Sequence, residues 1–390
     1  MSSLTPNKDF RADPKRGVYV QGRIDQQLID RLTPEIIRLQ AESRDPITVY
    51  IDSPGGSISH GEVLLRLLTA EDQGFSDPCR LITVVTSVAA SAAADLLSSG
   101  GYAIAYPGSV IFFHGVRSLT DNPLTVESAS SLRDSLRLSN DRYAMALADR
   151  SYWRLVFRYA TLRSQFEAHR AKQTPKDLSD LDCFVELISE KLSKKALKLI
   201  QQAQERNAKY ENLVDRVLAS AGRRKGFKAA KRVAEFEAAL LHGVIDVELR
   251  TNTGQDWKFT ERGIAQLSDD FFLLDEYLNN YETPQMLAQC RRWADYFLTD
   301  GNRKELEAIP EGSAREERKI EIVKPIIRPI WLFFVALCHA LQAGEYELTP
   351  LDAFWLGLID EVVGRKEEVT LRLIVEATVA ASTVAAAPAA

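Results

Sequence analysis

The sequence predicts an α/β protein with a largely parallel sheet, to which a long helical segment is added. Over residues 17–114, short apolar runs rich in β-branched residues alternate with segments of helical apolar period. Near residue 124 this alternation gives way to helical periodicity and dense charge. Apolar segments return after residue 326. These three observations indicate one layered core with a helical insertion.

The spacing of apolar residues along the sequence predicts each strand and helix of the core. Strands are expected where apolar runs are short and β-branched, at 17–22, 47–51, 81–85, 102–106 and 110–113. Helices are expected where the apolar period is helical, at 24–41, 58–69 and 125–150, and in the apolar run 330–341, with a further helix starting at Leu348. Residues 357–363 are expected to end this last helix and add a strand that closes the core.

Five segments follow from these elements. Residues 1–16 are expected to form a flexible N-terminal arm, and the Ala-rich residues 376–390 a disordered tail. Residues 17–150 and 326–375 are predicted to form the α/β core, and residues 151–325 a mostly helical insertion.

Composition excludes several classes of function. A net charge of −5 gives no global basic field for nucleic acid. The four cysteines share no metal-ligand spacing and are typical of reduced thiols in the cytoplasm, so we expect no metal. The apolar run Ile330–Leu341 is too short to span a bilayer. We expect a cytoplasmic protein with no membrane or nucleic-acid partner and no cofactor.

Ser91 is the candidate nucleophile. It follows the buried strand predicted at 81–85 and stands where a helix is expected to begin, among Ala89, Ala90, Ala92 and Ala93. Small neighbours leave room around the hydroxyl, and unpaired N–H groups at a helix start favour developing negative charge. The same pattern also fits a simple packing contact between helix and sheet.

Two further features complete a site for acyl transfer. Ser53-Pro54-Gly55-Gly56 ends a strand, and its glycines allow a sharp turn with unshielded N–H groups, as an oxyanion hole requires. His114 directly follows the strand at 110–113. In this scheme His114 takes the proton of Ser91, and N–H groups of Gly55, Gly56 and Ala92 hold the oxyanion.

These pieces resemble the proteolytic subunit of the Clp protease, ClpP. The matching motifs are SPGG at Ser53–Gly56, the alanines and serine ending at Ser91, the run Pro107–His114, and GLID at Gly357–Asp360. Their order and nearly all their spacings agree with that family, over about half of the chain. The resemblance implies a ClpP/crotonase-like spiral of ββα units and hydrolysis of peptide bonds by a Ser-His-acid triad. Residues 125–150 resemble the helix that joins the family's two rings.

The resemblance also implies an acid as the third member of the triad. Counting back from Gly357, the family's aspartate position holds Glu345, which we take as the candidate acid, with Asp352 as the alternative. A glutamate can orient an imidazole.

The leading hypothesis is therefore a ClpP-like serine endopeptidase in an oligomeric assembly. The resemblance implies peptide or unfolded-protein substrates and homo- or hetero-oligomeric rings. The chain has no G-x-x-x-x-G-K-[ST] loop, so any nucleotide-driven unfolding needs a separate AAA+ ATPase. Two alternatives remain: a catalytically inactive ClpP-like assembly subunit, and a crotonase-type acyl-CoA enzyme that shares the spiral.

Overall fold

The structure is a computed structural model and falls into two compact units. One unit comprises residues 1–200 and 338–390, and the other comprises Gln201–Leu337. The structure describes residues 10–70, 78–118, 123, 125–170, 179–222, 287, 290, 291, 294, 295 and 297–365.

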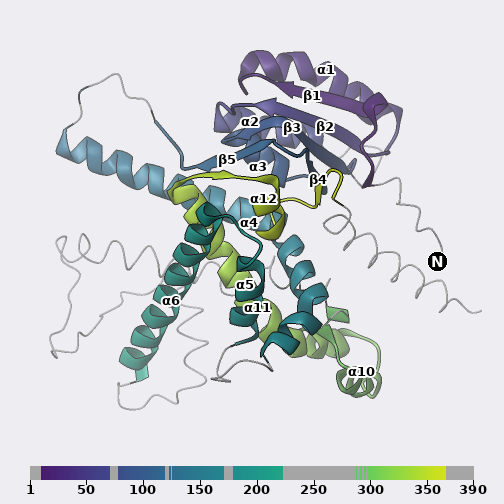
Figure 1. Ribbon diagram of the computed structural model, residues 1–390, viewed down its shortest axis with the longest axis vertical. Coiled ribbons are helices and arrows are strands. Elements are labelled where there is room, and N and C mark those ends of the chain that lie inside the picture. The colour runs from purple at the N-terminus through teal and green to yellow at the C-terminus, as the bar shows by residue number, and fades with distance from the viewer. Residues whose placement is uncertain are drawn as a thin grey trace, which may run out of the picture. The chain divides into compact units, whose positions relative to one another are not determined.

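The first unit is built on a mixed sheet of seven strands (Figure 1). Five strands lie in the order β1-β2-β3-β4-β7, and all their pairs are parallel. Outside this order, β5 pairs with β3, and β6 pairs with β5. The strands are β1 (Gly17–Gln21), β2 (Ile47–Ser53), β3 (Leu81–Ala90), β4 (Tyr102–Ala105), β5 (Val110–His114), β6 (Glu345–Leu348) and β7 (Glu361–Val362). The β5–β6 pair is antiparallel, so the sheet is mixed. The predicted α/β class is thus confirmed.

Strand β3 is longer than the sequence predicted. The strand was predicted at 81–85, but it continues through residues 86–90 and ends at Ala90. The reason lies in its pairing. The first half of β3 pairs with β4 from Ile82 to Val85, and the second half pairs with β5 from Val88 to Ala90. The backbone groups of residues 88–90 therefore find partners in a second strand, which keeps this stretch extended.

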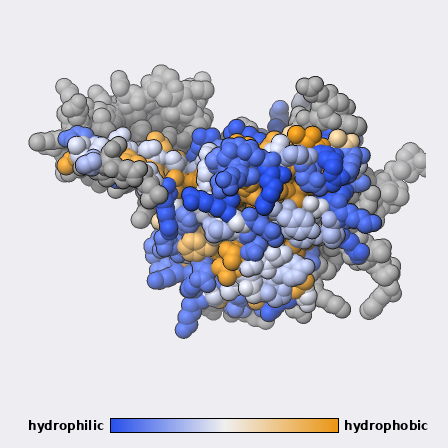
Figure 2. Space-filling view, turned by 90° about the horizontal axis from the view of Figure 1, so that it is seen from above, coloured by the Kyte–Doolittle hydropathy of each residue, from blue (hydrophilic) through white to orange (hydrophobic). Residues whose placement is uncertain are grey.

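The helices of the first unit include those that the apolar periods predicted at 24–41, 58–69 and 125–150. They are α1 (Gln26–Glu42), α2 (Ile58–Leu68), α3 (Ala92–Ser98), α4 (Val126–Arg170), α5 (Asp180–Ser189) and α12 (Pro350–Trp355), with the first turns of α6 (Lys194–Gly222) and the end of α11 (Ser313–Ala343). The face drawn in Figure 2 is mostly hydrophilic, with hydrophobic residues in small separate patches. Exposed large apolar side chains such as Ile37 and Val63 are ordinary on a protein surface.

The end of the predicted N-terminal arm is packed against the sheet. Phe10 is 4% exposed and its ring lies 5.2 Å from that of Tyr102. After the short helix η2 (Pro14–Arg16), the buried Arg16 donates hydrogen bonds to backbone carbonyls of Leu39, Ser43 and Asp45. Residues 10–16 are therefore not an arm, because an aromatic ring and a guanidinium hold them. Residues 1–9 and the predicted tail 376–390 lie outside the described residues.

The elements that the structure describes in the second unit are helices. Its elements are most of α6, helix α10 (Asp300–Glu307) and α11 up to Leu337. Thr299 and Asn302 form a capping box at the start of α10. The predicted domain boundaries at residues 151 and 325 stay a prediction; α4 runs without a break through the first of them. The modest strand signal predicted at 244–259 lies outside the described residues.

The described residues contain no transmembrane helix and no cluster of metal ligands. Among residues 10–365, with the gaps given above, none of the helices has the length and apolarity needed to cross a membrane. In the same residues no three His, Cys, Asp or Glu side chains gather as metal ligands would.

Helix α4 is 45 residues long and has two different parts. Its first turns project beyond the sheet in Figure 1, and Val126 there is 83% exposed. Its later turns are buried, including Tyr152, Arg154 and Tyr159. Residues 125–150 thus form part of a longer helix than the sequence predicted, because the apolar face continues to residue 162.

A buried arginine ties this helix to the sheet. The side chain of Arg154 forms an ion pair of 2.8 Å with Asp360, and both side chains are almost fully buried. Arg154 also donates to the carbonyls of Ser98 and Gly100 at the end of α3, while Asp360 accepts the N–H of Ala103 in β4. Three elements distant in sequence are therefore joined by one charge pair.

We expect Arg154→Met to lower the free energy of unfolding by about 3–5 kcal/mol, because it leaves a buried carboxylate without its partner. The double variant Arg154→Met/Asp360→Asn should lose less than the sum of the single changes. Urea unfolding measures all of these. Arg163→Met is the control, since the Arg163–Glu167 pair on the same helix is partly exposed and should contribute about 0–1 kcal/mol. Equal losses for Arg154→Met and Arg163→Met would contradict this account.

Candidate active site

Ser91 occupies a strained turn between β3 and α3. Its backbone has φ +57° and ψ −128°, and of all the residues that the structure describes it is the one non-glycine residue with positive φ. Such a conformation costs on the order of 1–3 kcal/mol and is found most often at functional sites. The Ser91 N–H donates to the carbonyl of Phe112 at 2.7 Å, which fixes the turn against β5. The hydroxyl makes no capping hydrogen bond to α3, so it is not used for structure there.

The glycine turn after β2 lies directly against Ser91. A Cβ atom placed on Gly55 would be 2.4 Å from the carbonyl oxygen of Ala90 and 2.7 Å from the Cβ of Ser91. Gly55 also has φ +86°, so both space and conformation require glycine. Gly56 is equally restricted, since its added Cβ would lie 2.2 Å from the carbonyl oxygen of Ile24. The structure thus brings together the predicted turn and the predicted nucleophile.

The three predicted oxyanion donors differ in their hydrogen bonding. The N–H of Gly55 donates to Ser53 Oγ at 3.1 Å, and that hydroxyl donates in turn to the carbonyl of Gly22 at 2.6 Å. Gly55 is therefore engaged in holding its own turn. Within the described chain, no acceptor is bound by the N–H of Gly56 or of Ala92, the first residue of α3. These two groups are the ones left to bind an oxyanion.

His114 lies at the same edge of the sheet as Ser91. Strands β3 and β5 are parallel, Ala90 pairs with Phe112, and each strand ends within two residues of that pair. In the described part of the chain Ser91 Oγ and the His114 ring form no hydrogen bond with each other. His114 Nδ1 lies instead 2.6 Å from the carbonyl oxygen of Gly115. A carbonyl can only accept, so Nδ1 carries the proton and Nε2 of the neutral ring is an acceptor.

Neither predicted acid is hydrogen-bonded to His114. Glu345 stands opposite His114 in the antiparallel β5–β6 ladder, but its exposed carboxylate pairs with Arg117. Asp352 is buried, and its two oxygens accept four hydrogen bonds from Ser193 and Thr349, which cap α12 and hold the start of α6. The ring is oriented by the backbone of Gly115, which the sequence pattern did not indicate.

A second group of titratable side chains lies around helix α3, the helix that follows Ser91. Asp95 is in the first turn of α3, and burial raises its pKa to about 7, although it accepts a hydrogen bond from Gln342 at 3.2 Å. Burial also raises the pKa of Asp149 to about 6. Burial raises the pKa of the Cys338 thiol as well, and the carboxylates of Asp95 and Asp149 raise it further. Sequence reasoning missed this group, whose one local signal is an acid within an alanine-rich helix start.

The comparisons with known proteins agree with this architecture. A family model described as Clp protease matches residues 10–126. Residues 10–126 are therefore similar to the Clp protease domain, the family that the motifs at Ser53–Gly56, Ser91 and Pro107–His114 indicated.

Curated relatives match the same part of the chain. It is 33% identical over 116 residues to the ATP-dependent Clp protease proteolytic subunit 1 of Mycobacterium tuberculosis, covering 29% of this chain and 54% of the relative. It is 34% identical over 122 residues to proteolytic subunit 1 of Corynebacterium jeikeium, covering 29% and 61%. The match to proteolytic subunit 2 of Corynebacterium glutamicum is 33% over 104 residues, covering 26% and 48%. The chain thus spans about half the length of the relatives that it matches.

The strain at Ser91 can be measured by comparing two substitutions. We expect Ser91→Gly to be more stable than Ser91→Ala by about 1 kcal/mol, because glycine adopts positive φ without the Cβ clash. Thermal and urea unfolding of the two variants test this. A Ser91→Ala variant as stable as Ser91→Gly would show that the turn is not strained.

The buried Asp95 predicts a pH dependence of stability. Its pKa in the folded protein, about 7, lies above its ordinary value of 3.8, so between these values the folded state holds a proton that the unfolded state has lost. Stability contributed by Asp95 should therefore fall as pH rises through this window, by at most about 1.4 kcal/mol per pH unit. Asp95→Asn keeps the acceptor for Gln342 and should flatten the profile between pH 4 and 7, as measured by urea unfolding. An unchanged slope would contradict the assignment.

Proposed function

We propose that this protein is a serine endopeptidase that hydrolyses peptide bonds with Ser91 as nucleophile and His114 as general base. The observation that carries the proposal is the strained Ser91 turn packed against Gly55, within a domain that matches the Clp protease family. A serine exposed at a sharp strand-to-helix turn is the arrangement that nucleophilic serines use in other hydrolases.

The reaction follows from these positions. His114 Nε2 takes the proton of Ser91 Oγ while the oxygen attacks the peptide carbonyl carbon. The N–H groups of Ala92 and Gly56 hold the oxyanion of the tetrahedral intermediate. The imidazolium then gives its proton to the leaving amine, and water releases the acyl group by the same steps in reverse. Catalytic hydrogen bonds are often long without substrate, so the Ser91–His114 bond is expected to form when a peptide binds.

Glu345 keeps its place in the proposal as the acid nearest the histidine in the strand ladder. To act on the ring it would have to leave Arg117, an exchange between two exposed partners. Exposed ion pairs contribute only about 0–1 kcal/mol, so this exchange is energetically accessible.

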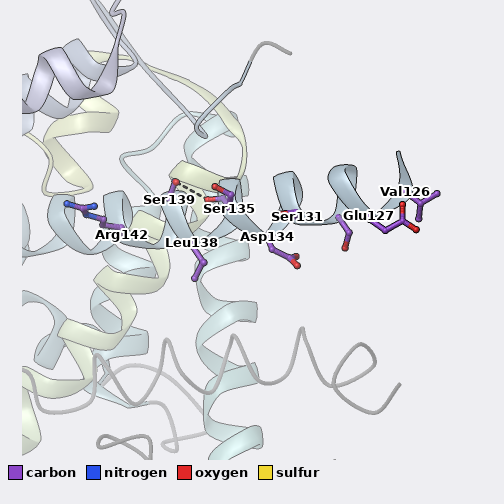
Figure 3. A pocket seen from close by; sticks show the side chains of 9 residues that line it. Val126, Glu127, Ser131, Asp134, Ser135, Leu138, Ser139 and Arg142 are labelled. Carbon is purple, nitrogen blue, oxygen red and sulfur yellow. Dashed lines mark hydrogen bonds between the residues drawn. The ribbon is translucent and has the colours of Figure 1, made fainter. Parts of the chain in front are cut away.

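We further propose an oligomeric assembly that uses the projecting end of α4. Figure 3 shows Leu138 and Asp134 extending from one side of this helix, and Leu138 is 55% exposed. Nine side chains of this helix between Val126 and Arg142 line an open hollow of about 900 Å³. By analogy with the family's rings, a second copy of the chain would cover this helix. Peptide or unfolded-protein substrates, a separate AAA+ ATPase partner and a cytoplasmic location belong to the same proposal.

One observation favours a second candidate function, that of an inactive assembly subunit. In the described residues, the serine hydroxyl, the histidine ring and the two candidate acids are not joined by hydrogen bonds. A protein kept only for its surface would not need them to be joined.

Labelling with a fluorophosphonate separates the two. We expect the full chain to react covalently at Ser91, and Ser91→Ala to lose labelling and peptide cleavage by about a thousandfold or more. Mass spectrometry of the labelled peptide identifies the residue. Ser87→Ala is the matched control, because Ser87 is an exposed serine on the same strand.

The alternative makes the opposite prediction. A folded, oligomeric protein in which Ser91 never labels and no peptide is cleaved would support the inactive subunit and overturn the endopeptidase. Binding of an acyl-CoA in calorimetry, with no labelling, would instead revive the crotonase-type enzyme.

A further inference from the structure

His114 is held by a peptide group where a triad would place a carboxylate. Its Nδ1–H donates to the carbonyl of Gly115 at 2.6 Å. That carbonyl belongs to the peptide unit that joins Gly115 to Val116. The opposite edge of the same planar unit carries the N–H of Val116, which points away from the carbonyl because the peptide is trans.

Asn140 binds this opposite edge. Its Oδ1 accepts the N–H of Val116 at 2.6 Å, and Asn140 lies on α4, 24 residues further along the chain. A continuous chain of hydrogen bonds therefore runs from Asn140 through the peptide to the imidazole. Each bond polarises the next, so the side-chain oxygen of Asn140 makes the Gly115 carbonyl a better acceptor.

The peptide is also fixed by packing. A Cβ atom on Gly115 would lie 2.4 Å from the carbonyl oxygen of Gln342 and 3.0 Å from Asn140 Nδ2. Only glycine fits between the end of α11 and helix α4 at this position. The chain thus has a glycine after its histidine and an asparagine on the long helix, and both serve the same peptide group.

We propose that Asn140 is a positioning residue for the reaction, acting through the Gly115–Val116 peptide to hold His114 as the Nδ1–H tautomer. This inference rests on the proposed function and deepens it, since it names the group that orients the His114 ring while Glu345 is paired with Arg117. The tautomer leaves Nε2 unprotonated, which is the form that accepts the proton of Ser91. The partial negative charge of the carbonyl then stabilises the imidazolium without a buried carboxylate.

The tautomer can be read directly by NMR of the full chain with ¹⁵N-labelled histidine. The chain has five histidines, and His114→Gln assigns the signal. We expect an Nδ1–H ring in the wild type and a shift towards Nε2–H in Asn140→Leu, which removes the acceptor of Val116. Asn140→Asp keeps an acceptor oxygen and should restore the wild-type signal.

Fluorophosphonate labelling and peptide cleavage give the second readout. Asn140→Leu should lower the labelling rate and kcat about tenfold to a hundredfold with little change in KM, since it removes one partly buried hydrogen bond and no substrate contact. Asn140→Asp should recover most of this loss. Thr161→Ala is the matched control, because the Thr161 hydroxyl donates to the carbonyls of Phe157 and Arg158 in its own helix.

The outcomes separate this inference from the proposed function. A wild type that never labels but shows the Asn140-dependent tautomer overturns the endopeptidase and leaves the positioning chain standing. An Nε2–H ring in the wild type, or Asn140→Leu with unchanged tautomer and rate, overturns the role of Asn140. If Asn140→Leu does not fold, Gly115→Ala, which displaces the same peptide, is expected to give the same change of tautomer; a folded Gly115→Ala with the wild-type tautomer also overturns it.

Discussion

The candidate site depends on the way β3 divides its hydrogen bonds between two neighbours. Its first half pairs with β4 and extends the main sheet, whereas its second half leaves β4 and pairs with β5. This change of partner brings the ends of β3 and β5 to one edge, with Ser91 on one and His114 on the other. The Gly55 turn completes the site because β2 pairs with β3 through Ser53 and Ala89. A shift of register in β3 would move all three apart.

Much of this arrangement follows from sequence because it depends on local rules. Alternating apolar runs predicted each strand of the main sheet, and the glycines predicted a turn that requires positive φ at Gly55. The extension of β3 through residues 86–90 could not be predicted, since it comes from pairing with β5. The local sequence also did not indicate that Phe10 and Arg16 would contact residues 30 or more positions away, Tyr102 and Pro46 respectively. Tertiary partners decided each of these cases.

At His114, too, the sequence predicted the position of a residue but not its contacts. Counting along the sequence placed Glu345 near His114, and the strand ladder does pair these two residues. Position in the sequence did not predict the hydrogen-bond partners. The carboxylate of Glu345 pairs with Arg117, and the ring of His114 donates to the carbonyl of Gly115. Backbone acceptors carry no residue identity, so a motif search for a third catalytic side chain passes over them.

The strained backbone at Ser91 has an evolutionary consequence. Serine at this turn is less favourable for folding than glycine, so random drift in a gene whose product served only as a scaffold would tend to relax the turn. Under the proposed function, chemistry at the hydroxyl opposes this drift. A glycine at this position is then the residue expected in a relative that has lost the hydrolysis proposed for Ser91.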